Sequence, residues 1–222
     1  MHEMILILDF GSQYTQLIAR RIRELNVYCE IHPWNKIPKI ESNVKGVILS
    51  GSPFSVRDAS SPLPDLSEIK GKTPLLGVCF GAQFLAHHFG GEVLPSSTRE
   101  YGRANLSFVD SNNILTKGMS NDSQVWMSHG DTIAQIPSNY LIISSTKDVE
   151  IAGYAIKDEQ TFGIQFHPEV YHTSEGKTLL SNFVVAICKC SRDWTPDSFV
   201  EETIKDLQTK LDNDKVILGL SG

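Results

Sequence analysis

A cysteine set between two glycines is the clearest sign of chemistry in this chain. The segment Gly77-Val78-Cys79-Phe80-Gly81 overlaps an apolar run at 75–78 that is typical of a buried strand, and apolar residues recur at helical spacing over 80–89. Cys79 is therefore predicted at a sharp strand-to-helix turn, a nucleophile elbow, whose glycines leave room for a substrate carbonyl. The N–H groups and the dipole at the start of the helix favour the thiolate, the form of cysteine that attacks.

The elbow pattern alone leaves an alternative open. Free cysteine is among the residue types most often buried, so Cys79 can equally be interpreted as a small apolar side chain in a core. Only partners elsewhere in the chain decide between these two interpretations.

His167 and Glu169 are the candidate partners. The sequence His167-Pro168-Glu169 comes directly after an apolar stretch at 162–166. Residues two apart in an extended chain project to the same side, and the residue before a proline is held extended, so the imidazole and the carboxylate can face one way. A carboxylate beside a histidine fixes its tautomer and stabilises its protonated form. Cys79, His167 and Glu169 are thus predicted to form a triad for acyl transfer.

Each member of the pair also has a plainer interpretation. Histidines are common at strand ends, and Glu169 could be a solvated surface residue. These alternatives lose weight because two strand-end features suited to the same reaction would have to coincide by chance.

An acyl-transfer site also needs N–H donors directed at the developing oxyanion. Phe80 supplies one at the start of the helix, and the turn Ser50-Gly51-Ser52-Pro53 can supply another because its residues are small. The segment 126–131, Trp-Met-Ser-His-Gly-Asp, is expected to be a polar turn after a strand that holds the charged end of a substrate. Without the triad, an ordinary turn would be the simpler interpretation.

The elements that must position these residues alternate between strands and helices early in the chain. Apolar runs at 5–8, 27–31 and 46–50 are predicted strands, and residues 17–25 follow a helical pattern. This alternation indicates right-handed βαβ units in a parallel sheet, where ligands gather at the carboxyl ends of the strands. The predicted fold class is α/β, with a mainly parallel but mixed central sheet and helices on both faces.

In the later part of the chain, strands no longer alternate with helices. From residue 93 short β-like pieces follow one another and are expected to extend the sheet as antiparallel or mixed strands. A helix is predicted over 174–187, and the compact domain is expected to cover residues 1–190. A linker helix at 191–214, opened by Thr195-Pro196, and a strand at 215–222 then suggest the start of a second domain.

Composition indicates a soluble globular protein with a sizeable core. The 222 residues are 41% hydrophobic and 21% charged, with a net charge of -6. The only basic cluster, Arg20, Arg21 and Arg23, is expected to be the solvated face of the first helix, which argues against nucleic-acid binding. The apolar run at 4–8 is too short for a signal peptide or a membrane span, so a cytoplasmic protein without membrane association is expected.

The cysteine content excludes a disulfide framework. The four cysteines are Cys29, Cys79, Cys188 and Cys190. A Cys-x-Cys pair with no matching Cys or His pair makes a poor zinc site, so Cys188 and Cys190 are expected to pack within the first domain.

The same motifs resemble the class I, or triad, glutamine amidotransferases, which have a flavodoxin-like fold. The segments 77–83 and 167–169 carry the likeness to the class. Within the class, the chain is most similar to the glutaminase domains of GMP synthetases. That narrower likeness covers essentially the whole chain and rests on the segments 8–16, 99–102, 125–131, 167–173 and 215–222.

The resemblance implies a role for each site residue. Cys79 would attack the side-chain amide of glutamine, His167 would relay the proton and Glu169 would orient His167. The main-chain N–H groups of Ser52 and Phe80 would form the oxyanion hole. The residues implied in binding glutamine are Gly51, Gln83, Ser128, His129 and Gly130.

One position departs from the family pattern. The family usually has two glycines before the proline of the oxyanion turn, and the second is Ser52 here. The backbone donor survives this change, but a requirement for positive φ would cost about 1 kcal/mol or more in strain.

The resemblance also implies a larger enzyme. The segment 215–222 is similar to the first strand and the opening of the pyrophosphate loop of an ATP pyrophosphatase domain. In such an enzyme the ammonia would pass to ATP-activated XMP, giving GMP, AMP and pyrophosphate. ATP and Mg would belong to that other domain, so no cofactor or metal is expected in this chain, and the parent enzyme is expected to be a homodimer.

The expected function is therefore that of a glutaminase that releases glutamate and ammonia through a γ-glutamyl thioester on Cys79. Two rivals stay open. A cysteine hydrolase or peptidase on a similar sheet would accept esters or peptides without requiring a free amino-acid end. A non-catalytic docking module would carry an unreactive thiol.

Overall fold

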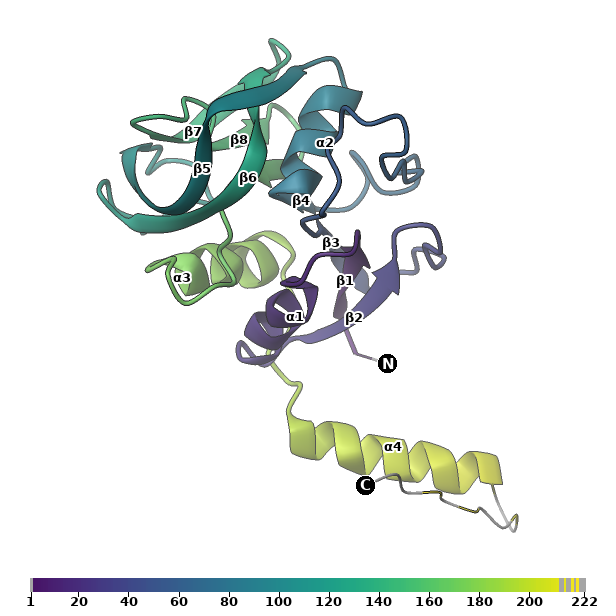
Figure 1. Cartoon of the computed structure of the whole chain (residues 1–222). Coiled ribbons are helices and arrows are strands. Elements are labelled where there is room, and N and C mark those ends of the chain that lie inside the picture. Colours follow the sequence, from purple (N-terminus) through teal and green to yellow (C-terminus); the bar gives the residue numbers. More distant parts are fainter. Residues whose placement is uncertain (1, 212–213, 215–216, 218, 220–222) are drawn as a thin grey trace.

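A single mixed β-sheet organises the part of the chain that the structure describes. A computed structural model describes residues 2–211, 214, 217 and 219. The strands in this part are β1 (Met4–Asp9), β2 (Tyr28–Pro33), β3 (Val44–Leu49), β4 (Leu75–Val78), β5 (Glu92–Val109), β6 (Gln124–Gln135), β7 (Tyr140–Thr146), β8 (Gly153–Ile156) and β9 (Thr161–Ile164). Their order in the sheet is β2-β1-β3-β4-β9-β8-β7-β5-β6 (Figure 1).

The two halves of the sheet differ in strand direction. From β2 to β9 every neighbouring pair is parallel, so the carboxyl ends of β1, β3, β4 and β9 lie at one edge. From β9 to β6 every pair is antiparallel. The prediction of a mainly parallel but mixed α/β sheet is confirmed.

Helices cover both faces of the sheet, as predicted. The helical elements are α1 (Thr15–Arg23), α2 (Phe80–His88), α3 (Gly176–Ser181), the π-helical η1 (Asn182–Ile187) and α4 (Pro196–Leu211). Alternate residues of β1 enter different cores: Ile5 and Ile7 pack with α1, α3 and η1, whereas Leu6 and Leu8 pack with α2. This alternation follows from the two-residue period of a strand that is buried on both sides.

The prediction of a polar turn at 126–131 is wrong. These residues lie within β6, which pairs with β5 from Asn105↔Gln124 to Glu92↔Gln135 with two register shifts on the way. Main-chain hydrogen bonds sustain an antiparallel ladder whatever the side chains are, so a polar stretch continues the strand when a partner strand runs beside it. The long, curved β5 and β6 lie at the top of Figure 1.

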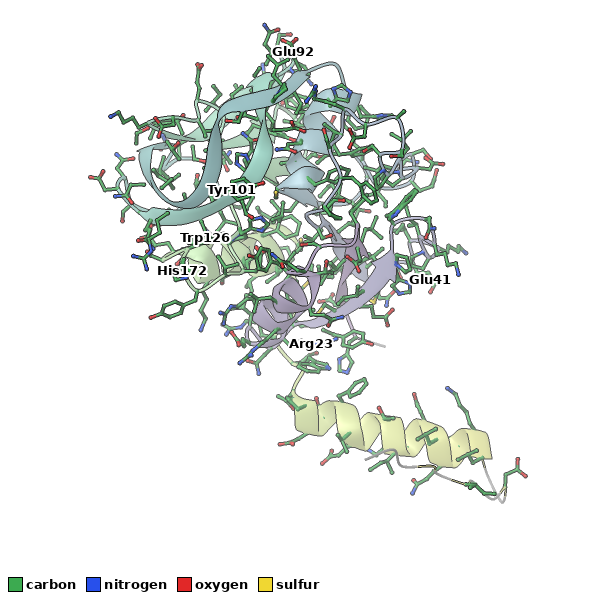
Figure 2. All side chains as sticks on the ribbon, viewed as in Figure 1. Arg23, Glu41, Glu92, Tyr101, Trp126 and His172 are labelled. Carbon is green, nitrogen blue, oxygen red and sulfur yellow. The ribbon has the colours of Figure 1, made fainter. Side chains whose placement is uncertain are left out.

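The basic cluster of α1 is largely solvated, as expected, because Arg20 and Arg23 are exposed and only Arg21 is partly buried. Arg20 is exposed, but Arg21 donates to the main-chain oxygen of Glu169 at 2.9 Å. Arg23 donates to Cys29 O at 3.2 Å and lies 5.8 Å from the centre of the Trp194 ring. Figure 2 shows Arg23 at the end of the domain that faces α4.

The C-terminal elements agree with the sequence in part. The helix predicted over 174–187 is observed as α3 followed by η1, and α4 occupies most of the predicted linker helix. Thr195 caps α4, because its Oγ1 accepts from Ser198 N at 3.0 Å. The strand predicted at 215–222 lies outside the described residues except for 217 and 219, and the domain boundaries at 190 and 214 remain predictions.

The strand-to-helix turn after β4 depends on close backbone contact. A Cβ atom on Gly77 would lie 2.6 Å from the main chain of Gly81, and one on Gly81 would lie 2.6 Å from Leu49 O. Only glycine lets α2 approach β3 and β4 this closely.

We expect Gly81→Ala to lower the free energy of unfolding by about 1–3 kcal/mol, because the added methyl group must displace the backbone of β3. Gly130→Ala is the matched control, since its Cβ would meet only Tyr101 Oη at 3.8 Å. Urea denaturation of both variants checks this expectation. Equal losses in the two variants would contradict it.

Candidate active site

Cys79 stands at the carboxyl end of β4 in a strained backbone conformation. Its φ of 52° and ψ of -107° lie outside the regions that a non-glycine residue prefers. Two main-chain bonds hold this turn: Cys79 N donates to Ile164 O at 2.8 Å, and Gln83 N donates to Cys79 O at 3.0 Å. Strain of this kind costs about 1–3 kcal/mol and clusters at functional sites. The elbow predicted from the glycine spacing is therefore present.

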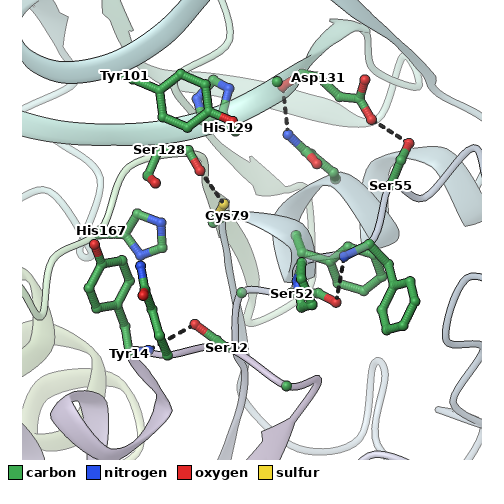
Figure 3. A pocket seen from close by; sticks show the side chains of 18 residues that line it. Ser12, Tyr14, Ser52, Ser55, Cys79, Tyr101, Ser128, His129, Asp131 and His167 are labelled. Carbon is green, nitrogen blue, oxygen red and sulfur yellow. Dashed lines mark hydrogen bonds between the residues drawn. The ribbon is translucent and has the colours of Figure 1, made fainter.

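His167 lies beside Cys79 because β9 is the parallel neighbour of β4. Val78 pairs with Ile164, so the chain that follows β9 passes the elbow. The Nδ1 of His167 lies 2.7 Å from Glu169 Oε1, and the Cys79 thiol donates to Ser128 O at 3.9 Å. Figure 3 shows the imidazole near the thiol, with Tyr14 on its outer side. The structure thus brings the predicted Cys, His and Glu together.

Burial excludes the plainer interpretations of this pair. The exposed fractions of His167 and Glu169 are 2% and 0%. Glu169 is therefore not a solvated surface residue, and its carboxylate is directed at the imidazole.

Burial and charge act in opposite directions on the pKa of His167. Burial lowers it, but the neighbouring Glu169 carboxylate, whose Oε1 lies 2.7 Å from the ring, and the nearby Cys79 raise it further, so the pKa lies well above its ordinary value. The imidazole accordingly carries its proton at neutral pH next to the sulfur. A proton donor is thereby in place before a substrate arrives.

Three further contacts fix His167 and Glu169. Thr173 Oγ1 donates to His167 O at 2.5 Å and accepts from Trp126 N at 3.0 Å. The Tyr14 ring meets the His167 ring edge-on at 5.0 Å, and Arg21 holds the main chain of Glu169. No spacing in the sequence signals these partners, because they come from α1, β6 and the segment after β9.

The oxyanion turn lies after β3, next to the elbow. Ser52 Oγ donates to Phe10 O at 2.9 Å and accepts from Phe54 N at 3.2 Å, which ties the turn to the end of β1. Ser52 is not among the residues with positive φ, so serine meets no strain at this position. The main-chain N–H groups of Ser52 and Phe80 donate to no acceptor among the described residues, so both can donate to a ligand.

A cavity of about 570 Å³ opens over Cys79. A Cβ on Gly51 would lie 3.2 Å from Ser12 Oγ, so glycine allows the turn to pack closely against Ser12. Every predicted site residue except Glu169, which lies behind His167, lines this cavity. The lining residues predicted from sequence are Gly51, Ser52, Cys79, Phe80, Gln83, Ser128, His129, Gly130 and His167.

Other lining residues were not among the site residues predicted from the sequence. Ser12 and Tyr14 follow β1, and Tyr101 lies on β5 opposite Ser128 of β6 (Figure 3). Asp131 holds the loop after the oxyanion turn, since its carboxylate accepts from Ser55 Oγ and pairs with Arg57 at 3.2 Å. Of these positions only Asp131 lies in a segment, 126–131, that was expected to hold a substrate.

His129 lines the cavity as an uncharged side chain. Burial lowers its pKa to about 4, and the positive charge of His167 acts in the same direction. His129 is therefore uncharged at neutral pH. It can offer a ligand a hydrogen bond but not a positive charge.

The three remaining cysteines are buried, and the described residues include neither a metal-binding cluster nor a helix that could span a membrane. Cys29, Cys188 and Cys190 are buried free thiols, and burial raises the pKa of Cys29 to about 11 and that of Cys190 to about 12. The described residues include no group of three or more His, Cys, Asp or Glu that could hold a metal ion. Among these same residues, no helix has the length and apolar character needed to cross a membrane.

We expect Glu169→Gln to lower the pKa of His167, because the negative charge is lost while burial remains. NMR titration of the imidazole signals measures this pKa, with the exposed His87 and His88 as internal controls that should not move. A His167 pKa unchanged by the substitution would contradict the charge argument.

The same substitution has a consequence for stability. A raised pKa in the folded state stabilises the fold fully below about pH 6.5, the ordinary histidine value, and this contribution is lost as pH rises through the folded-state pKa. Above about pH 6.5 the free energy of unfolding should therefore fall more steeply with pH in the unsubstituted protein than in Glu169→Gln.

Comparison with known proteins assigns this arrangement to a family. The family model described as glutamine amidotransferase class-I matches residues 6–187. Relatives named glutamine-hydrolysing GMP synthase align with all 222 residues, at 66% identity in Cytophaga hutchinsonii, 59% in Bacteroides fragilis and 54% in Porphyromonas gingivalis. The chain spans 44% of the length of each of these relatives.

Solved structures show the same fold. A Thermoplasma acidophilum protein provisionally described as part of a GMP synthase is 30% identical, with a TM-score of 0.74 over 92% of this chain and 98% of that one. A glutamine amidotransferase from Thermotoga maritima is 19% identical, with a TM-score of 0.63 over 95% of this chain and 93% of that one. At this identity the second likeness bears on the fold alone.

Proposed function

Because the chain belongs to the class I glutamine amidotransferase family, we propose that it hydrolyses the side-chain amide of L-glutamine to glutamate and ammonia. The observation that carries the proposal is the buried set of Cys79, His167 and Glu169 at the floor of a cavity. The raised pKa of His167 supports an imidazolium that can give a proton to the leaving group.

The first half of the reaction transfers the γ-glutamyl group to sulfur. The Cys79 thiolate attacks the amide carbon, and the N–H groups of Ser52 and Phe80 stabilise the negative oxygen of the tetrahedral intermediate. The protonated His167 gives its proton to the amide nitrogen, the C–N bond breaks and ammonia leaves. A γ-glutamyl thioester and a neutral imidazole remain.

The second half returns the enzyme to its starting state. The neutral His167 takes a proton from water, the hydroxide adds to the thioester carbon, and the same N–H groups stabilise the second oxyanion. The C–S bond breaks, releasing glutamate and the thiolate. Glu169 keeps the imidazole in the tautomer that both halves need.

Recognition of glutamine is proposed for the residues above the triad. Gln83, Ser128, His129 and Gly130 would hold the α-amino and α-carboxylate groups, and Gly51 would leave room for the side chain. Their positions around one cavity with Cys79 support this assignment.

A larger reaction is proposed for an enzyme that includes this domain. In the relatives named GMP synthase, matching residues form less than half of the protein. We propose that the ammonia aminates ATP-activated XMP to GMP in such an enzyme, with ATP, Mg and XMP bound by an ATP pyrophosphatase domain. A homodimeric parent enzyme is part of the same proposal and rests on the resemblance.

A glutamine-shaped electrophile provides the sharpest test of the glutaminase proposal. Diazo-oxo-norleucine should add once to Cys79 in the folded chain, and excess glutamine should suppress the adduct, because both compounds compete for one cavity. Intact-mass measurement and peptide mapping check the stoichiometry and the position. Cys79→Ala should abolish both the adduct and ammonia release.

The rivals predict other outcomes. Cys188→Ala serves as a control, since this thiol lies in the core outside the cavity, and it should label like the unsubstituted chain. Labelling without protection by glutamine would favour a general cysteine hydrolase. Folded protein without any adduct on Cys79 would favour a docking module and count against the glutaminase proposal.

A further inference from the structure

A fully buried amide lies behind the cavity. Gln165 has an exposed fraction of 0% and makes four hydrogen bonds. Its Oε1 accepts from Ile133 N at 3.2 Å and from Gln83 Nε2 at 3.3 Å. Its Nε2 donates to Ile151 O at 2.9 Å and to Thr132 Oγ1 at 3.5 Å. Gln165 thus joins β6, α2 and the segment between β7 and β8.

The main chain determines which way this amide points. The N–H group of Ile133 can only donate and the carbonyl of Ile151 can only accept, so the oxygen of Gln165 must face the first and its nitrogen the second. A flipped amide would place like groups against each other at both ends. The orientation of Gln165 therefore follows from backbone groups that cannot change role.

The fixed orientation of Gln165 in turn fixes the orientation of the Gln83 amide. The Nε2 of Gln83 donates to Asp131 O at 2.8 Å as well as to Gln165 Oε1. Both partners are acceptors, so both N–H bonds of the Gln83 amide are committed. Its Oε1 accepts from no other described residue and is the polar atom left for a ligand in the cavity that Gln83 lines.

An oxygen at this position distinguishes the two charged groups of an amino acid. A carbonyl oxygen accepts from an ammonium group and repels a carboxylate. We propose that Gln165 is a positioning residue that sets the polarity of substrate recognition, by holding Gln83 so that its oxygen meets the α-ammonium of glutamine. This inference rests on the proposed glutaminase function and specifies that Gln83 binds the α-ammonium group of glutamine.

Protection of Cys79 tests the assignment. Iodoacetamide has neither α group, so its reaction with Cys79, followed by peptide mapping, reports only on occupancy of the cavity. The competitors are glutamine, glutaramate, which lacks the α-ammonium, and 4-aminobutanamide, which lacks the α-carboxylate. In the unsubstituted chain glutamine should protect at the lowest concentration.

Gln165→Met should lower the preference for glutamine over glutaramate but not the preference for glutamine over 4-aminobutanamide. The advantage of glutamine over glutaramate should fall about ten-fold, the size of a charge-assisted hydrogen bond, because Gln83 then keeps only its bond to Asp131 O and its amide is no longer fixed by two acceptors. The advantage over 4-aminobutanamide should stay within two-fold. A merely structural role for Gln165 would alter both advantages together or neither, and either result would overturn the proposal.

Two further variants sharpen the test. Gln165→Glu, protonated in this buried position, keeps an oxygen toward Gln83 and a donor toward Ile151 and should retain the preference. Thr132→Ala removes only the longest of the four bonds and should leave the preference within two-fold.

A folding failure of Gln165→Met would not end the test. Gln83→Met removes the proposed oxygen itself and should abolish the advantage over glutaramate, and a retained advantage would overturn the proposal. Failure of glutamine to protect Cys79 in the unsubstituted chain would instead count against the glutaminase function, so the two failures are distinguishable.

Discussion

The parallel pairing of β4 with β9 is the constraint on which the site depends. These strands are far apart in sequence, yet Cys79 N donates to Ile164 O at 2.8 Å where they end. Since parallel strands finish at the same edge, this pairing puts a nucleophile and a histidine side by side. β3 and β1 are the next strands on the same side and add the oxyanion turn and the segment with Tyr14.

The interior that surrounds this edge makes two unfavourable features tolerable. Cys79 keeps a positive φ because glycine contacts with β3 and β4 and two main-chain hydrogen bonds determine the turn from both sides. The imidazole of His167 and the carboxylate of Glu169 are buried, which is costly for either charge alone but is offset by their proximity at 2.7 Å. Exclusion of water also strengthens the field that a developing oxyanion meets.

The antiparallel half of the sheet contributes the wall of the cavity. β6 supplies Trp126 O, which accepts from His167 N at 2.9 Å, and its next residues carry the polar groups opposite Cys79. The same strand is tied to α2 through Gln83 and to the oxyanion loop through Asp131. A single strand therefore connects His167, the wall of the cavity and the loop after Ser52, so a shift in its register would disturb all three.

The sequence by itself determined the fold class, the elbow at Cys79 and the His167–Glu169 pair, because each depends on local spacing: apolar periodicity, glycines two residues from the nucleophile and alternation along an extended chain. Only the tertiary structure decided that 128–131 belong to a strand, that Arg21 holds Glu169 and that Gln165 constrains Gln83. These features depend on which distant backbone groups come to lie opposite each other. Local spacing does not encode that pairing, because a polar residue suits a turn, a solvated helix face or a buried hydrogen bond equally well until its partner is known.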